Sequence, residues 1–195
     1  MSRVHLLLRP QHLRLRSGAW HREHDRCRCS PVQLVTSHVV VISDTHMPRP
    51  GRELARAVLE ELNRADLVLH LGDFTRLEVA ERLERYAPLV GIHGNNDDPD
   101  VRRKYPARQQ LELEGRLIVM IHGDVGARTA TQAARAQTSG DVVLFGHSHQ
   151  AHLEWQEDRL FLNPGSPTDK RWSPHRSFAL LDVGETIDAT LVPLD

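Results

Sequence analysis

The sequence predicts an α/β fold in which two mixed β-sheets pack together and helices cover their outer faces. Between residues 38 and 145, short apolar runs rich in β-branched residues alternate with segments of helical periodicity. That alternation is typical of βαβ units with parallel strands. Strand-like runs separated by turns indicate antiparallel pairing toward the end of the chain. With 195 residues, of which 39% are hydrophobic, the chain has the size and composition of one domain, or one domain with an extension.

Five apolar runs are expected to be strands buried on both faces, because they are short and almost continuously apolar. They are residues 39–42, 66–71, 89–92, 117–121 and 142–145. Three segments between these runs have a helical pattern. They are the segment with Leu54, Val58 and Leu62, the segment with Leu77, Ala80 and Leu83, and the alanine-rich residues 127–136.

Five further strands are expected in runs that are bounded by tight turns. They are residues 108–114, 151–156, 159–163, 176–183 and 186–192. The sequence Asn163-Pro164-Gly165-Ser166 is a clear turn signal. Runs of this kind join antiparallel strands, so both sheets should be mixed.

The first 37 residues differ in composition from the rest of the chain. They hold seven arginines against Glu23 and Asp25, a net charge of +5, whereas residues 38–195 hold 18 basic and 24 acidic residues, a net charge of −6. No helical or strand period runs through the segment. We interpret residues 1–37 as a flexible basic extension, or as upstream sequence translated from a start codon placed too early, and residues 38–195 as the domain.

Four metal-binding residue types lie close together in this extension, at His21, His24, Cys27 and Cys29. Their spacing matches no usual zinc-site pattern, in which two ligand pairs lie well apart, so coincidence is the favoured interpretation. A Cys27–Cys29 disulfide would close a very small, strained loop. Reduced thiols are therefore expected, and with them a cytoplasmic location.

The overall charge and hydropathy exclude several classes of partner. The net charge of the whole chain is −1, which argues against charge-driven binding to nucleic acid or to a membrane surface. The longest apolar runs have about five residues, far fewer than the roughly 20 that a transmembrane helix needs. A small phosphate ester, discussed below, is the expected partner, and a homo-oligomer is left open.

Each of the five apolar runs is followed at once by polar residues that can bind a metal. These are Ser43-Asp44-Thr45-His46, Gly72-Asp73, His93-Gly94-Asn95-Asn96-Asp97, His122-Gly123-Asp124 and Gly146-His147-Ser148-His149. Ligands of α/β sheets bind at the carboxyl ends of parallel strands, so these side chains are expected to meet at one edge of the sheet. Each motif alone is weak, and the prediction depends on the ordered set of five.

The series Asp44-x-His46, Gly72-Asp73, Gly94-Asn95, His122-Gly123 and Gly146-His147-x-His149 resembles the calcineurin-like metallophosphoesterase superfamily. The short length and the Gly-Asn-Asn-Asp motif resemble its small YfcE-like phosphodiesterase branch. The resemblance covers about residues 38–190. It implies a four-layer α/β/β/α sandwich of two mixed sheets, with a dinuclear metal centre.

The resemblance also implies a role for each motif residue. Asp44, His46 and His149 would hold one metal, Asn95, His122 and His147 would hold the other, and Asp73 would bridge the two. Carboxylate, amide and imidazole donors suit Mn²⁺ best among the candidates, with Fe, Zn²⁺, Ni²⁺ and Mg²⁺ as alternatives. The implied activity is hydrolysis of a phosphate ester, most of all a phosphodiester, by in-line attack of a metal-bridging hydroxide.

The sequence departs from many relatives at Asn96, which stands where they carry a histidine that protonates the leaving group. An amide does not titrate, so Asn96 cannot act as a general acid, although it can donate a hydrogen bond to a phosphate oxygen. The catalytic set is therefore expected to be Asp73, Asn95 and Asn96. We predict a slow enzyme that prefers esters with acidic leaving groups.

Two other functions stand beside this one. The superfamily includes a retromer-subunit branch that uses the same fold as a non-catalytic protein-binding scaffold and has lost metal ligands, whereas all seven positions here carry residues able to coordinate. A DNA-repair nuclease is disfavoured by the negative charge of the domain.

Several neighbouring residues also have simpler structural interpretations. His70 and His93 are expected in the core or behind the ligands, and His152 and His175 on the surface. Asp97, Asp124 and Ser166 could support the site or simply form turns. Arg49 and Arg76 could contact substrate phosphate or be ordinary surface arginines.

Overall fold

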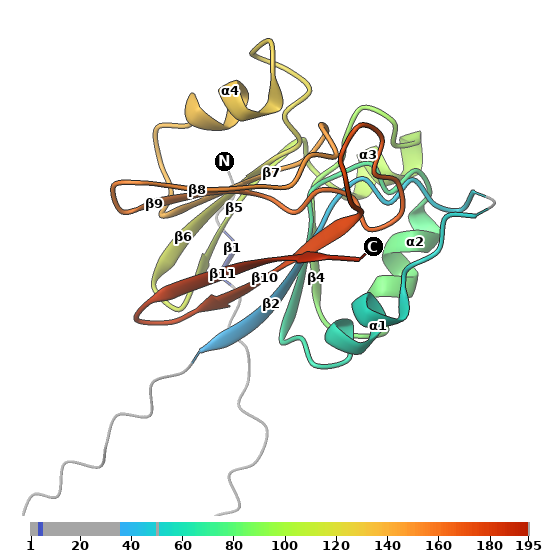
Figure 1. Ribbon diagram of the computed structural model, residues 1–195, viewed down its shortest axis with the longest axis horizontal. Coiled ribbons are helices and arrows are strands. Elements are labelled where there is room, and N and C mark those ends of the chain that lie inside the picture. Colours follow the sequence, from blue (N-terminus) through green and yellow to red (C-terminus); the bar gives the residue numbers. More distant parts are fainter. Residues whose placement is uncertain (1–3, 6–35, 50, 195) are drawn as a thin grey trace, which may run out of the picture.

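A computed structural model describes residues 4–5, 36–49 and 51–194, which form two stacked β-sheets (Figure 1). The first sheet has six strands in the order β1 (Val4–His5), β5 (Arg108–Leu113), β6 (Arg116–Ile121), β7 (Val142–Phe145), β9 (Arg159–Asn163) and β8 (His152–Gln156). The second sheet has five strands in the order β11 (Ile187–Pro193), β10 (Ser177–Val183), β2 (Ser37–Ile42), β3 (Leu67–His70) and β4 (Leu89–Gly91).

Helices cover the outer face of each sheet, so the predicted four-layer sandwich is confirmed (Figure 1). The helices α1 (Arg56–Leu62), α2 (Leu77–Leu83) and α3 (Pro99–Lys104) pack on the five-stranded sheet. The helix α4 (Ala130–Arg135) packs on the six-stranded sheet through Ala130, Ala133 and Ala134. The central strands are therefore buried on both faces, by the other sheet on one side and by helices on the other.

Burial on both faces explains why the central strands are continuously apolar. In β2, Val39 and Val41 face the core between the sheets, whereas Val40 and Ile42 face the helices, and all four side chains are fully buried. Successive side chains of a strand point to opposite faces, so a strand covered on both sides needs an apolar residue at every position. Each of these strands therefore ends at or next to the end of its continuous run of apolar residues.

Both sheets are mixed, as predicted. Strands β2, β3 and β4 are parallel, and β10 pairs antiparallel with both β2 and β11. In the other sheet β6 and β7 are parallel, whereas β5 and β6 form an antiparallel hairpin. One pairing differs from the expectation for the last part of the chain. Strand β9 pairs antiparallel with β8 but parallel with β7, because it lies between them.

Three elements depart from the sequence-based prediction. Helix α3 was not predicted, because it has only six residues and buries only Val101. Its start is set by Pro99 and by the Asp98 side chain, which accepts a hydrogen bond from the Val101 amide. Helix α4 begins at residue 130 rather than 127, because Thr129 caps it. The two-residue strand β1 pairs parallel with β5 and lies in the predicted extension.

Most of the first 37 residues lie outside the described part of the chain. The His21, His24, Cys27 and Cys29 group lies outside the described residues, so its interpretation as a coincidence stays a prediction, as does the flexibility of the extension. Among the described helices, the longest have seven residues, and none is long and apolar enough to cross a membrane.

His38, near the start of strand β2, connects this strand with strand β10 and helix α1. Its Nδ1 lies 2.7 Å from Asp182 Oδ1 on β10, and its Nε2 lies 3.3 Å from Glu61 Oε2 on α1. Burial alone would lower the pKa of His38, but the hydrogen bonds and charges of the two carboxylates outweigh it and raise the pKa above the ordinary value. The protonated imidazole therefore stabilises the fold.

We expect His38→Gln to destabilise the protein more at pH 5.5 than at pH 9. A group whose pKa is raised by folding contributes stability below its unfolded pKa, about 6.5, and that contribution is lost as the pH rises through the folded pKa. The measurement is the Tm of the wild type and the variant at both pH values, with the exposed His175→Gln as the control. A Tm difference that stays constant or grows toward pH 9 would contradict this assignment.

Candidate metal centre

Loops from both sheets build the site. Asp44 and His46 follow β2, Asp73 follows β3 and Asn95 follows β4, all in the five-stranded sheet. The remaining three candidates follow strands β6 and β7 of the six-stranded sheet; they are His122, His147 and His149. The expectation of a single sheet edge is therefore corrected. The sheets pack face to face, and the carboxyl ends of strands from both of them meet at the same place.

The backbone at this place is strained. Asp44, His46, Asp73, His147 and His149 have positive φ angles of 54°, 46°, 59°, 68° and 59°. Residues with a Cβ rarely adopt this left-handed region, which costs about 1–2 kcal/mol for each of them. Such strain persists only where the surrounding structure imposes it, and it clusters at functional sites. Five of the seven candidate residues share this feature.

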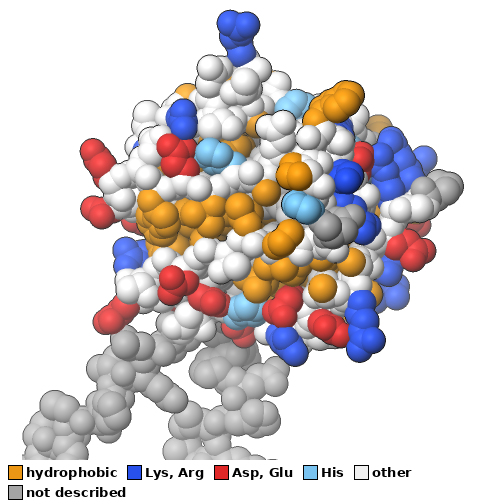
Figure 2. Space-filling view, in the orientation of Figure 1, with side chains coloured by type: hydrophobic (Ala, Val, Ile, Leu, Met, Phe, Trp, Pro, Cys, Tyr) orange, Lys and Arg blue, Asp and Glu red, His pale blue; other side chains and the backbone are white. Residues whose placement is uncertain are grey.

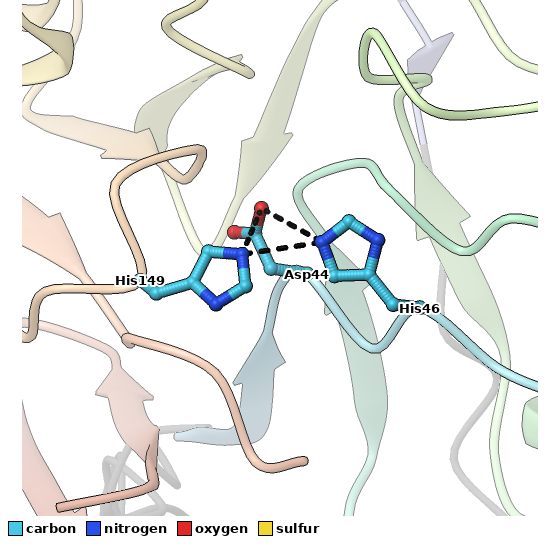
Figure 3. Close-up of side chains that lie close together, drawn as sticks. All are labelled: Asp44, His46 and His149. Atoms are coloured by element: carbon cyan, nitrogen blue, oxygen red, sulfur yellow. Dashed lines mark hydrogen bonds and ion pairs between the residues drawn. The ribbon is translucent and has the colours of Figure 1, made fainter. Parts of the chain in front are cut away.

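The first group of candidates is Asp44, His46 and His149 (Figure 3). The Nε2 atoms of His46 and His149 lie 3.1 Å apart. Asp44 Oδ1 lies 3.4 Å from His149 Nε2 and 3.9 Å from His46 Nε2. All three side chains are buried, and three donor atoms therefore face one small volume.

The hydrogen bonds behind this group leave lone pairs pointing into that volume. His149 Nδ1 donates to the Asp169 carbonyl oxygen at 2.6 Å, so its Nε2 carries the free lone pair in the neutral ring. Asp44 Oδ2 accepts from the Ser43 hydroxyl and from the His147 amide. Asp44 Oδ1 is buried without a hydrogen-bond partner in the structure. An unpartnered buried carboxylate oxygen beside an imidazole lone pair fits a bound cation.

The second group contains Asp73, Asn95, His122 and His147. His122 Nε2 lies 3.2 Å from Asn95 Oδ1 and 3.5 Å from Asp73 Oδ2, and His147 Nδ1 lies 3.1 Å from Asn95 Oδ1. His122 Nδ1 donates to the Leu71 carbonyl oxygen at 2.7 Å, which again turns the other ring nitrogen toward the site. Second-nitrogen hydrogen bonds of this kind are typical of metal-binding histidines.

The pKa values of His46 and His122 are shifted in opposite directions, because burial and the nearby carboxylates oppose each other with different outcomes. Burial is the largest influence on both. It lowers the pKa of His46 to about 4 in spite of the nearby carboxylates. At His122, the hydrogen bond with Asp73 and the charges of Asp44 and Asp73 outweigh burial and raise the pKa to about 9. The carboxylates therefore attract positive charge to this position.

Asp73 lies between the two groups. Its Oδ2 is 3.6 Å from His46 Nε2 and 3.5 Å from His122 Nε2. Asp44 also belongs to both groups, because its donor atom lies within 4.8 Å of those of Asp73 and His122. Two buried carboxylates thus connect His46 of the five-stranded sheet with the histidines of the six-stranded sheet.

Asn96 holds the Asp73 carboxylate. Its backbone amide donates to Asp73 Oδ1 at 2.8 Å, and its side-chain Nδ2 donates to Asp73 Oδ2 at 2.7 Å. Burial raises the pKa of Asp73, but the hydrogen bonds from His122 and Asn96 outweigh it and hold the pKa well below its usual range. The structure thus shows Asn96 fixing a candidate metal ligand, and its hydrogen bond to a substrate phosphate stays a prediction.

Asp97 ties together the loops that carry the site. Its carboxylate accepts hydrogen bonds from three backbone amides, those of Asp73, Gly94 and Thr75. The loop after β3 is thereby joined to the loop after β4. Of the two interpretations given by the sequence, supporting residue or turn former, the structure shows the first.

Two further supporting residues carry no sequence signal. The Ser43 hydroxyl donates a hydrogen bond to Asp44 Oδ2, and the Asp169 carbonyl oxygen accepts one from His149 and so orients its ring. The sequence left open whether Ser166 supports the site or simply forms a turn. Its hydroxyl donates to the Asp44 carbonyl oxygen at 2.8 Å, so it holds the strained backbone of that residue.

His70 is a core residue, as expected. Its Nδ1 accepts from the Gly72 amide, and its Nε2 contacts the Thr45 hydroxyl at 3.1 Å. The ring stacks on Phe74, with 3.5 Å between the centroids. Burial lowers its pKa to about 3, so the ring is neutral.

Glycines of the motifs allow the close approach of the loops. A Cβ on Gly94 would collide with Asp73 Oδ1, and a Cβ on Gly146 would collide with the Ser43 hydroxyl. Both overlaps involve atoms already held by hydrogen bonds, so neither can shift freely. Any residue with a Cβ would overlap these atoms, so both positions require glycine.

The two arginines noted beside the motifs have different surroundings. Arg76 lies 3.5 Å from Asp98 Oδ2 and is largely exposed. Arg49 lies in the loop after β2 and lines a pocket there. Asp124 is exposed, and His93 contacts the Gly94 carbonyl through Nδ1.

Comparison with known proteins identifies the family of this chain. Residues 38–186 match the calcineurin-like phosphoesterase superfamily domain. A probable metallophosphoesterase of Methanothermobacter thermautotrophicus is 36% identical over 159 residues, which cover 78% of this chain and 90% of the relative. A phosphodiesterase of Methanocaldococcus jannaschii is 27% identical over 137 residues, 64% of this chain and 81% of the relative.

A structural likeness shows the same fold at lower identity. Vacuolar Protein Sorting 29 from Cryptosporidium parvum superposes with a TM-score of 0.64 at 19% identity and covers 82% of this chain and 98% of its own. The domain match spans almost all of the described sandwich, including all seven candidate residues. On this basis the chain belongs to the calcineurin-like phosphoesterase superfamily.

Proposed function

We propose that the protein is a phosphodiesterase that works with two divalent metal ions. The observation that carries this proposal is the position of Asp73. One carboxylate oxygen lies 3.6 Å from His46 Nε2 and 3.5 Å from His122 Nε2, between two sets of inward-facing lone pairs. Two cations sharing one carboxylate would satisfy all of these atoms.

We propose the division of the residues between the two positions that the family resemblance implies. Asp44, His46 and His149 would hold one cation, and Asn95, His122 and His147 the other, with Asp73 shared. A mixed set of oxygen and imidazole donors without thiolate fits Mn²⁺, which we propose as the metal. When bound, the pair would supply a hydroxide at near-neutral pH and neutralise the charge of the phosphoryl oxygens.

The chain itself supplies orientation rather than proton transfer to the leaving group. The Leu71 and Asp169 carbonyls fix the rings of His122 and His149. Asn96 fixes Asp73 and has no titratable proton. The residue after Asn95 therefore cannot protonate a leaving oxygen, and we infer that good leaving groups are needed.

The nature of the substrate is inferred from a relative. A phosphodiesterase is among the proteins with similar sequences, and we propose a small phosphodiester as the substrate here. A cytoplasmic location and the absence of a nucleic-acid partner stay predictions. The likeness to Vacuolar Protein Sorting 29 shows the fold, and a scaffold role would not require the convergent donor atoms.

Asp73→Asn is expected to abolish hydrolysis of bis-p-nitrophenyl phosphate. Loss of residues that only support metal ligands costs about 10–100-fold in activity, so loss of the shared carboxylate should cost more than about 100-fold. The assay uses metal-stripped protein to which Mn²⁺, Mg²⁺, Zn²⁺ or Ni²⁺ is added back. The matched control is Asp188→Asn, an exposed residue on β11. Unchanged turnover in Asp73→Asn would contradict the proposal that the two cations share the Asp73 carboxylate.

Turnover should also depend steeply on the leaving group. We expect kcat to fall along a series of methyl aryl phosphodiesters as the phenol becomes less acidic, because Asn96 donates no proton to the departing oxygen. The comparison variant is Asn96→His, which should make the dependence shallower by restoring an acid at that position. Equal rates along the series in the wild-type enzyme would refute this inference.

A further inference from the structure

A hollow lies where the loop after His46 faces helix α2. Its volume is about 560 Å³, within the range of small-molecule sites, which is about 300–1,000 Å³. Four arginines line it, Arg49, Arg52, Arg82 and Arg85. We call this hollow the arginine pocket. In Figure 2 several Lys and Arg side chains gather on the right-hand side of the molecule, where α2, α3 and this loop lie.

The charge of the arginine pocket is positive and mostly unpaired. Its lining holds two glutamates, Glu53 and Glu78, against the four arginines, a net charge of +2. Among the ion pairs of the described residues, only Arg52 of the four has a carboxylate partner, Asp169. A positive pocket is unusual on a domain whose residues 38–195 carry a net charge of −6. This distribution favours an anionic ligand.

Arg52 connects the arginine pocket with the metal centre. Its Nη2 donates to Asp169 Oδ2 at 2.6 Å, and the backbone carbonyl of Asp169 accepts from His149 Nδ1. The other guanidinium nitrogen, Nη1, is buried and has no hydrogen-bond partner in the structure. A bound anion could accept a hydrogen bond from this buried guanidinium N–H. Met47, which lines the pocket, directly follows His46.

We propose that the arginine pocket binds a second phosphate group, on the part of the substrate that is not hydrolysed. This inference rests on the proposed phosphodiesterase function. Guanidinium groups bind phosphate through paired N–H donors, which suits Arg52 and its unpartnered nitrogen. The apolar lining by Met47, Pro48 and Val79 would cover the organic part between the two phosphates. The substrate is then a phosphodiester that carries a separate terminal phosphate.

Two p-nitrophenyl esters that differ only in this group test the proposal. They are thymidine 5′-(p-nitrophenyl phosphate) and its 3′-phosphorylated form. We expect the Mn²⁺-loaded protein to have a KM about tenfold lower for the 3′-phosphorylated ester, since a charge-assisted contact of about 1.4 kcal/mol corresponds to a factor of ten. The values of kcat should be similar, because the contact is made equally before and during the reaction.

The variant Arg82→Gln/Arg85→Gln should remove this preference and leave hydrolysis of the unphosphorylated ester unchanged. Arg82 lies on α2 and Arg85 just after its end, and both are exposed, so the fold should tolerate the change. The control is Arg135→Gln on α4, which removes one positive charge from the opposite layer of the sandwich. Equal KM values for the two esters in the wild type, or a preference that survives in the double variant, would overturn the proposal.

A binding measurement separates this proposal from the proposed activity. Thymidine 3′,5′-bisphosphate is titrated calorimetrically into metal-free protein. We expect about tenfold weaker binding to the Arg82→Gln/Arg85→Gln variant than to the wild type. Equal binding would overturn the pocket assignment even if both esters are hydrolysed. If neither ester is hydrolysed but the difference in binding is found, the phosphodiesterase function fails and the phosphate-binding pocket stands. Binding without the KM difference would indicate a site for free phosphate compounds, which contradicts a substrate role.

Discussion

The structure depends on one electrostatic constraint, which is that metal-binding atoms from two sheets are buried close together around two carboxylates. Asp44 Oδ1 has no hydrogen-bond partner, and the Nε2 atoms of His46 and His149 lie 3.1 Å apart. Leaving such groups buried and unsatisfied costs free energy, and a cation resolves the cost at once. The left-handed backbone at five of these residues shows that the fold accepts further cost to keep them in place.

The fold meets this constraint by placing strained loops on rigid strand ends. Strands β2, β3, β6 and β7 are buried on both faces, so the residues that follow them have little freedom to move apart. Asp97 joins the amides of two loops, and Ser166 holds the backbone of Asp44. Donor positions are thus set by the packed core rather than by the loops themselves. The arginine pocket is lined by the loop after His46, which carries one of the candidate metal ligands, and by exposed arginines at and after α2.

Sequence alone predicted the layers and the set of converging residues, because both leave local signals. A strand buried on both faces must be apolar throughout, as residues 39–42 are, and metal-binding residue types directly after it stand out. What it could not predict depends on contacts between distant segments. Strand order decides that the strand ends belong to two different sheets. The approach of two loops brings Asn96 into contact with Asp73. The support of His149 by Asp169 uses a backbone carbonyl, which every residue has.

The central claim is that two cations share Asp73 between the histidines of the two sheets. Crystals grown with Mn²⁺ and measured for anomalous scattering at the manganese edge test it most directly. The account predicts two anomalous peaks about 3.5–4 Å apart, one contacting Asp44, His46 and His149 and the other Asn95, His122 and His147, with Asp73 touching both. A single peak, or peaks away from these side chains at saturating Mn²⁺, would contradict it.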